Sequence, residues 1–148
     1  MSNQTPQVDK VTDIIKVMNG GIEFYQDGIE KVSQQNLKAM FTRMITEKQE
    51  AIAALQPYAV SEQGDAETDS DWTVDVRNMY TNLLGALSSN KDHTYVDQLE
   101  EVEDKVLEAI DGALEENQPA NCATELRRVR VRMQQCHDEM KSLQDATA

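Results

Sequence analysis

The sequence lacks the motifs that most often identify an enzyme. It has no Gly-rich phosphate-binding loop, no Gly-x-Ser-x-Gly elbow and no Cys-x-x-Cys pair, so nothing points to conventional hydrolytic or phosphoryl-transfer chemistry. It also lacks an apolar run near the roughly 20 residues that span a bilayer. The first ten residues, MSNQTPQVDK, have neither the basic nor the apolar region of a signal peptide. We therefore expect a cytoplasmic protein that is not an enzyme.

Positive charge is also scarce. The 148 residues include 14 Lys and Arg against 27 Asp and Glu, which gives a formal net charge of -13 at pH 7. Binding to a phosphate backbone or to an anionic membrane depends on basic residues. We therefore expect no nucleic-acid partner and no membrane partner.

Cysteine occurs only twice, as Cys122 and Cys136. The two lie on one predicted helix, about 21 Å apart at 1.5 Å per residue, whereas a disulfide needs Cα atoms within about 7 Å. They cannot pair with each other, and we expect two small buried apolar residues. An intermolecular bridge or a redox-active thiol is the alternative.

What the sequence does contain is four apolar stripes with the spacing of an amphipathic helix. The clearest begins after Pro119, and its members are Cys122, Leu126, Val129, Met133, Cys136, Met140 and Leu143. A first helix of about 24 residues is expected from Asp9, with the stripe Val11, Ile15, Met18, Ile22, Tyr25, Ile29 and Val32. The second stripe is Leu37, Met40, Phe41, Met44, Ala51, Leu55 and Tyr58, and the third is Tyr95, Leu99, Val102, Val106, Ala109 and Ala113.

The lengths of the connections predict how these helices pair. Short breaks at Ser33–Asn36 and Glu116–Gln118 make two antiparallel hairpins. Between the hairpins lie an acidic segment from Val60 to Asp71, expected to be a solvated loop, and a shorter helix from Trp72 to Leu87. One long crossover between two hairpins is the ferritin-like arrangement. We predict an all-α, ferritin-like four-helix bundle, with residues 1–8 as a disordered tail and residues 9–145 as one domain.

Two features interrupt the stripes. Gly20, Gly21 and Gly28 each cost a helix about 1 kcal/mol relative to alanine, and we expect them to allow a close approach of a neighbouring backbone. Glu47 and Lys48 occupy the middle of the second stripe, and they are the one charged interruption of a core stripe in the first half of the chain.

Charges predict how the last two helices face each other. Folding the second hairpin about residue 118 places Arg128 level with Glu108, and Arg132 level with Asp104. We expect surface ion pairs that orient the two helices. An anion site at the arginine cluster, which comprises Arg127, Arg128, Arg130 and Arg132, is the alternative.

A ferritin-like dinuclear metal centre can be tested against the sequence. Such a centre uses one Glu from each of two helices and a Glu-x-x-His pair from each of the others. The chain has only His93 and His137, so two such pairs are impossible. A mononuclear iron or manganese site formed by Glu47, Glu50 and His137 is the alternative that we retain.

His137 has other interpretations as well. Folding the hairpin brings it level with Glu100, and we expect a half-buried histidine paired with that carboxylate. A phosphotransfer histidine is disfavoured, because the expected lysine and glycine do not follow at the right positions and Asp138 and Glu139 would repel a phosphoryl group.

Four stretches carry a family resemblance. They are GIEFYQDGIEKV from Gly21 to Val32, the isolated Trp72, the acidic LEEVEDKVLEAIDGAL of residues 99–114, and the pair His137-Asp138 ahead of Leu143. From about Asp9 to Leu143 the chain resembles an uncharacterised bacterial family of ferritin-like four-helix-bundle proteins, often called a domain of unknown function. Where that family tends to show Gly-Glu-Asp, this chain has Val102-Glu103-Asp104. The resemblance implies a ferritin-like fold and no established activity.

Two hypotheses for function follow. The first is a non-enzymatic bundle that acts by self-association as a homo-oligomer or through a protein partner, for which methionine-rich stripes would be suited. The second is a ferritin-like metal-binding protein with a reduced site at Glu47, Glu50 and His137.

Overall fold

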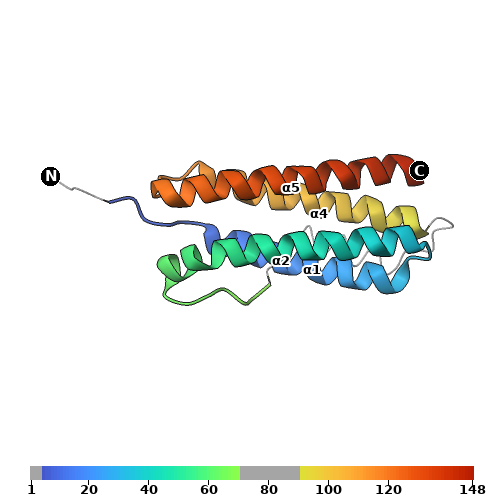
Figure 1. The fold of residues 1–148 in the computed structure, drawn as a ribbon, viewed down its shortest axis with the longest axis horizontal. Helices are drawn as coiled ribbons and strands as arrows, with labels where there is room; N and C mark the ends of the chain where they lie inside the picture. The colour runs from blue at the N-terminus through green and yellow to red at the C-terminus, as the bar shows by residue number, and fades with distance from the viewer. Residues whose placement is uncertain (1–4, 71–90) are drawn as a thin grey trace.

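The protein is a bundle of long α-helices (Figure 1). The structure is a computed structural model, and it describes residues 5–70 and 91–148. All regular structure within these two ranges is α-helical, which confirms the predicted all-α class. The helices are α1 (Val11–Lys31), α2 (Gln35–Gln63), α4 (Lys91–Leu114) and α5 (Ala120–Thr147). The helix predicted from Trp72 to Leu87 lies outside the described residues.

The helices form two hairpins that pack side by side. α1 lies against α2 and α4, and α5 lies against α4 and α2, so α1 and α5 are diagonal to each other. α2 ends at the end of the bundle where α1 begins, whereas α4 begins at the opposite end (Figure 1). Hydrogen bonds from Thr12 to Glu62 and from Ser33 to Asp92 join these ends. Every pair of neighbouring helices is therefore antiparallel.

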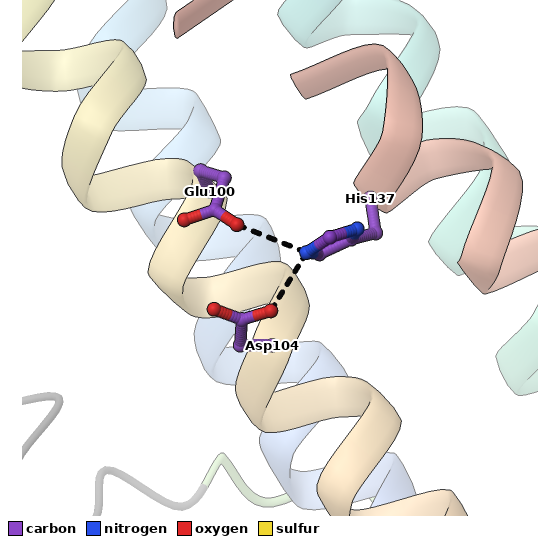
Figure 2. Close-up of side chains that lie close together, drawn as sticks. All are labelled: Glu100, Asp104 and His137. Carbon is purple, nitrogen blue, oxygen red and sulfur yellow. Dashed lines mark ion pairs between the residues drawn. The ribbon is translucent and has the colours of Figure 1, made fainter. Parts of the chain in front are cut away.

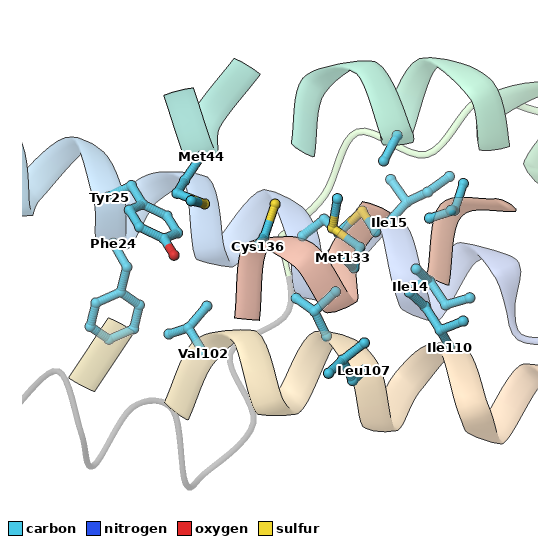
Figure 3. Close-up of a cluster of buried hydrophobic side chains, with 14 of the residues drawn as sticks. Ile14, Ile15, Phe24, Tyr25, Met44, Val102, Leu107, Ile110, Met133 and Cys136 are labelled. Carbon is cyan, nitrogen blue, oxygen red and sulfur yellow. The ribbon is translucent and has the colours of Figure 1, made fainter. Parts of the chain in front are cut away.

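The apolar stripes form a single core (Figure 3). Most predicted stripe residues are buried, which confirms the predicted helical faces. On α1 the buried face is wider than predicted, since Ile14 and Phe24 are fully buried while Ile22 and Ile29 are half-buried. The reason is that α1 packs against two helices at once, so residues on both sides of the predicted stripe face a neighbour.

Two glycines on α1 lie where a side chain would collide with a neighbouring helix. A Cβ at Gly21 would lie 3.0 Å from Cγ1 of Val102 and 3.7 Å from Cε of Lys48, and a Cβ at Gly28 would lie 3.1 Å from Cε2 of Phe41. The predicted close approach is therefore present, but side chains rather than a backbone make it. At Gly21 the tight neighbour is Val102, whereas the aliphatic part of Lys48 lies at ordinary contact distance.

The C-terminal part of α2 differs from the prediction. The helix continues through Pro57 to Gln63 and ends at Gly64, whose φ of 94° places it in the left-handed region that favours glycine. The predicted solvated loop from Val60 therefore starts four residues later, and two of its carboxylates are structural. Glu62 accepts hydrogen bonds from the backbone of α1, at 2.9 Å from the Val11 nitrogen. Glu67 is buried.

Asp92 caps a helix other than its own. Its carboxylate accepts hydrogen bonds from the Ser33 nitrogen (2.9 Å), the Ser33 hydroxyl (2.8 Å) and the Gln34 nitrogen (3.2 Å). These groups precede the first turn of α2. Burial alone would raise the pKa of Asp92, but the bonds from Ser33 and Gln34 outweigh it and lower that pKa below its ordinary value.

Asp92→Ala is expected to destabilise the bundle by about 1–2 kcal/mol at pH 7, because backbone donors ahead of α2 lose their acceptor. A carboxylate with a lowered folded-state pKa stabilises the fold above its unfolded-state pKa, and that contribution is lost as the pH falls through the folded-state pKa. The difference between variant and wild type should therefore be complete above about pH 5 and shrink below about pH 4. Urea unfolding at both pH values, with the exposed Asp65→Ala as control, tests this. A difference independent of pH would contradict it.

Candidate functional site

Polar side chains from all four helices meet near the middle of the bundle. They form an inner cluster, which we define as Tyr25, Lys48 and Glu103, and an outer cluster, which we define as Glu100, Asp104 and His137. Glu100, Glu103 and Asp104 all belong to α4, so this helix is shared by the two clusters.

The inner cluster is a buried ion pair. The side chains of Lys48 and Glu103 are both 0% exposed, and the Lys48 ammonium contacts Oε2 of Glu103. The Tyr25 hydroxyl donates a hydrogen bond of 2.5 Å to the same oxygen. The ammonium also lies 5.1 Å from the centre of the Tyr25 ring, where a cation is attracted to the ring face. Burial and the charge of Glu103 raise the pKa of Tyr25 well above its ordinary value, so its hydroxyl remains a donor.

The sequence explains why a lysine reaches the core. Lys48 lies four residues after Met44 and three before Ala51, so it occupies a core-facing position of α2. Glu103 has the same relation to Leu99 and Val106 on α4. The interruption at Lys48 is evident in the sequence, but the burial of this lysine and its partner were not predicted. The helical spacing was the signal that could have identified both residues.

The outer cluster lies between α4 and α5. His137 points from α5 toward two carboxylates that are one turn apart on α4 (Figure 2). Its Nε2 is 2.9 Å from Oε1 of Glu100 and 2.7 Å from Oδ1 of Asp104. The predicted pairing of His137 with Glu100 is therefore confirmed, and Asp104 is a second partner that the sequence did not predict.

The outer cluster has the composition of a metal site. One potential ligand atom from each of its three side chains lies within 4.8 Å of the other two. In the part of the chain that the structure describes, no other three side chains of His, Cys, Asp or Glu come this close together. One imidazole and two carboxylates suit divalent first-row metals such as manganese, iron, cobalt or zinc. Glu100 is nearly buried, while the side chain of Asp104 is 38% exposed, so an ion can reach the cluster from solvent.

Neighbouring side chains orient the histidine. Nδ1 of His137 lies 3.3 Å from Oδ1 of Asp138, which accepts a hydrogen bond of 3.0 Å from Gln134. A histidine that binds a metal usually donates its other ring N–H to a carboxylate or carbonyl in this way. With Nδ1 directed to Asp138, Nε2 faces Glu100 and Asp104, where it donates a proton to the carboxylates when no ion is bound and would offer its lone pair to a bound cation.

The outer cluster shifts the pKa values of its own members. Burial raises the pKa of Glu100, and the charge of Asp104 raises it further, while His137 opposes both. Burial would lower the pKa of His137, but the carboxylates of Asp138, Asp104 and Glu100 outweigh it and raise that pKa. The cluster thus holds positive charge between its carboxylates, either as a proton on His137 or as a bound cation.

The structure places the other predicted metal ligands elsewhere. Glu47 and Glu50 both bind Arg132, with Oε2 of Glu47 at 2.8 Å from its Nη2. Within the described ranges they do not form a three-ligand group with His137. A guanidinium is thus the cation between these two carboxylates.

The predicted partners of the arginines are wrong. Arg132 binds Glu47 of α2 instead of Asp104. The reason is that Arg130 faces α4, and a residue two positions later lies about 200° further around the helix. Arg128 pairs with Glu125 of its own helix rather than with Glu108. The bridge that does join α4 and α5 at this level is Arg130 to Asp111, at 2.5 Å.

A pocket of about 370 Å³ lies between α2 and α5, and Arg132 of the arginine cluster contributes to its wall. Its two basic residues are Arg43 and Arg132. Arg43 binds Glu139, and Arg132 binds Glu47 and Glu50. The carboxylates therefore neutralise both guanidinium groups, and the pocket does not favour an anion.

Both cysteines are free and buried, as predicted. Burial raises the pKa of Cys122 to about 11, and burial likewise raises that of Cys136 to about 11. The thiolate is the reactive form of cysteine, so neither position has the properties of a redox-active thiol at neutral pH.

The fold and the two clusters define a class of protein: an α-helical bundle with a buried ion pair at its centre and a histidine–carboxylate cluster at its edge. A family model described as "Domain of unknown function (DUF2383)" matches residues 7–116, and the chain belongs to this family. The match includes α1, α2 and α4 with their carboxylates, and ends before α5 and His137. Neither the curated proteins nor the solved structures yielded a match. None of the described helices has the length and apolar character that a membrane span requires.

Proposed function

We propose that this protein is a ferritin-like bundle that binds one divalent transition-metal ion at Glu100, Asp104 and His137. The observation that carries the proposal is the convergence of three potential ligand atoms from two helices, with the histidine oriented by Asp138. The ferritin-like topology is supported by the path of the chain, since α2 ends and α4 begins at opposite ends of the bundle (Figure 1).

A dinuclear centre of the ferritin type does not fit this interior. Such a centre needs several inward carboxylates and two histidines at one level. Here Glu103 is the fully buried carboxylate at the centre, and the ammonium of Lys48 binds it. Only His137 of the two histidines belongs to the clusters, because His93 contacts Thr147 at the end of α5. The donors present therefore support a mononuclear site.

The oxygen-rich ligand set favours manganese or iron over metals that prefer sulfur. Three protein ligands leave coordination positions for water or a small ligand, and the nearby groups do not form a recognisable set of catalytic residues. We therefore propose metal binding, as in buffering or sensing of a metal ion, rather than catalysis.

Glu100→Gln is expected to weaken Mn(II) binding by more than about tenfold, because loss of a direct ligand should cost at least as much as loss of an outer-shell partner. The measurement is equilibrium dialysis of chelator-treated protein against Mn(II), followed by metal analysis, and wild type should bind one equivalent. Glu101→Gln is the matched control, since Glu101 is the next residue and is exposed. A wild-type protein that binds no Mn(II), or equal binding by the two variants, would reject the proposal.

Self-association or a protein partner, the other sequence-based hypothesis, has less support. Val60 and Val131 are the large hydrophobic side chains that are exposed in the described ranges, at 46% and 60%, and they lie on different helices. Two separate valines do not form an apolar docking surface of the size that marks interaction sites.

A further inference from the structure

Two polar bridges join α4 and α5 two helical turns apart. Asp104 and Asp111 are seven residues apart on α4, and their partners His137 and Arg130 are seven residues apart on α5. Seven residues are close to two full turns, so both bridges lie on the same side of the hairpin. Arg130 is not a member of the outer cluster, and the proposed metal site does not include it.

Two bonds to one carboxylate fix the guanidinium of Arg130. Its Nε donates a hydrogen bond of 2.5 Å to Oδ1 of Asp111, and its Nη2 donates one of 3.2 Å to Oδ2. This fork holds the planar group in one orientation. The remaining nitrogen, Nη1, lies 3.5 Å from Oε1 of Gln134, one turn further along α5. The orientation of Arg130 therefore determines which end of the Gln134 amide can face it.

Gln134 connects this fixed guanidinium with the histidine. Arginine has only donors and an ionised aspartate has only acceptors, so the amide of Gln134 directs its oxygen to Arg130 and its nitrogen to Asp138. The nitrogen donates a hydrogen bond of 3.0 Å to Oδ1 of Asp138. The same oxygen lies 3.3 Å from Nδ1 of His137. A continuous series of polar contacts thus runs along α5 from the Asp111 bridge to the imidazole.

We infer that Gln134 is a positioning residue of the metal site, which Arg130 holds in place and which acts through Asp138. It keeps the Asp138 carboxylate where Nδ1 of His137 donates to it, so that Nε2 stays directed at the two carboxylates of α4. Fixing a side chain before a ligand binds reduces the entropy that binding costs. The inference rests on the proposed function, because this benefit is realised only when an ion binds.

The test compares Gln134→Met with Gln135→Met. Both changes replace an amide by an apolar side chain of similar length, and Gln135 is the exposed neighbour on the same helix. We expect Gln134→Met to weaken Mn(II) binding by about tenfold relative to Gln135→Met, which is the lower end of the effect of losing an outer-shell partner. Equal affinities of the two variants would overturn the inference.

A double variant distinguishes positioning from a general loss of stability. Asp138→Ala should itself weaken Mn(II) binding. In that background Gln134→Met should have no further effect, because the residue through which Gln134 acts is gone. An effect of Gln134→Met that persists undiminished without the Asp138 carboxylate would count against the inference.

The ring of His137 provides a measurement that needs no metal. In the metal-free protein, the nitrogen NMR resonance of Nδ1 reports the contact with Asp138, and it should move in Gln134→Met but not in Gln135→Met. If wild type binds no Mn(II) and the resonance still moves only in Gln134→Met, the proposed function fails and the positioning role stands. If wild type binds Mn(II) and the resonance is the same in both variants, the proposed function stands and the inference fails.

Discussion

Glu103→Gln is expected to cost about 3–5 kcal/mol of folding free energy, because it leaves the Lys48 ammonium buried without its counter-charge. The ammonium and the carboxylate are both inaccessible to water, so solvent cannot replace the lost interaction. The Tyr25 hydroxyl also loses its charged acceptor. This is the largest effect on stability that we expect from a single change of charge in the described part of the bundle.

Urea unfolding followed by circular dichroism measures this cost. Glu108→Gln is the control, because Glu108 belongs to the same helix but its side chain is 67% exposed, and exposed pairs contribute about 0–1 kcal/mol. Lys48→Met/Glu103→Leu should recover most of the loss, since an apolar pair can replace a buried ion pair. A Glu103→Gln variant as stable as Glu108→Gln would show that the buried pair is not formed.

His137→Gln is expected to weaken Mn(II) binding strongly. The loss of affinity should exceed the about 10–100-fold decrease that follows loss of an outer-shell partner. The substitution removes the one nitrogen ligand of the outer cluster and leaves two carboxylates on a single helix. The measurement is the dissociation constant for Mn(II). His93→Gln is the matched control, because the other histidine lies at the end of the bundle beside Thr147 and should leave the affinity unchanged.

The pH dependence of the Mn(II) affinity is a second test of the role of His137. Metal binding requires neutral imidazole, and Asp138, Asp104 and Glu100 raise the pKa of His137 against the effect of its burial. As the pH falls below that pKa, wild-type affinity should therefore fall by about tenfold per pH unit, because one proton competes with the ion. His137→Gln should lack this part of the slope. Identical pH profiles for the two proteins would exclude His137 as a ligand.

Helical periodicity was sufficient to predict much of the fold. The stripe from Cys122 to Met140 is buried as expected, and the two short breaks produce the two antiparallel hairpins. Periodicity predicts which face of a helix is apolar, but it does not predict how many other helices pack against that face. For this reason the burial of Ile14 and Phe24 became evident only in the structure.

The site was harder to predict, because its contacts depend on the rotation of each helix. Arg132 was expected to meet Asp104, yet it binds Glu47, and Asp104 contacts His137. Lys48 and Glu103 are 55 residues apart, and each one alone resembles a lapse in an apolar stripe. Only the packing of the helices shows that the two charged side chains are in contact and neutralise each other.

A crystal structure of the protein soaked with Mn(II), with anomalous diffraction data, tests the central claim most directly. We expect one anomalous peak, bounded by Glu100, Asp104 and His137, with the Lys48 ammonium still in contact with Glu103. Absence of a peak at the outer cluster, or a peak at the bundle centre with Lys48 displaced from Glu103, would contradict it.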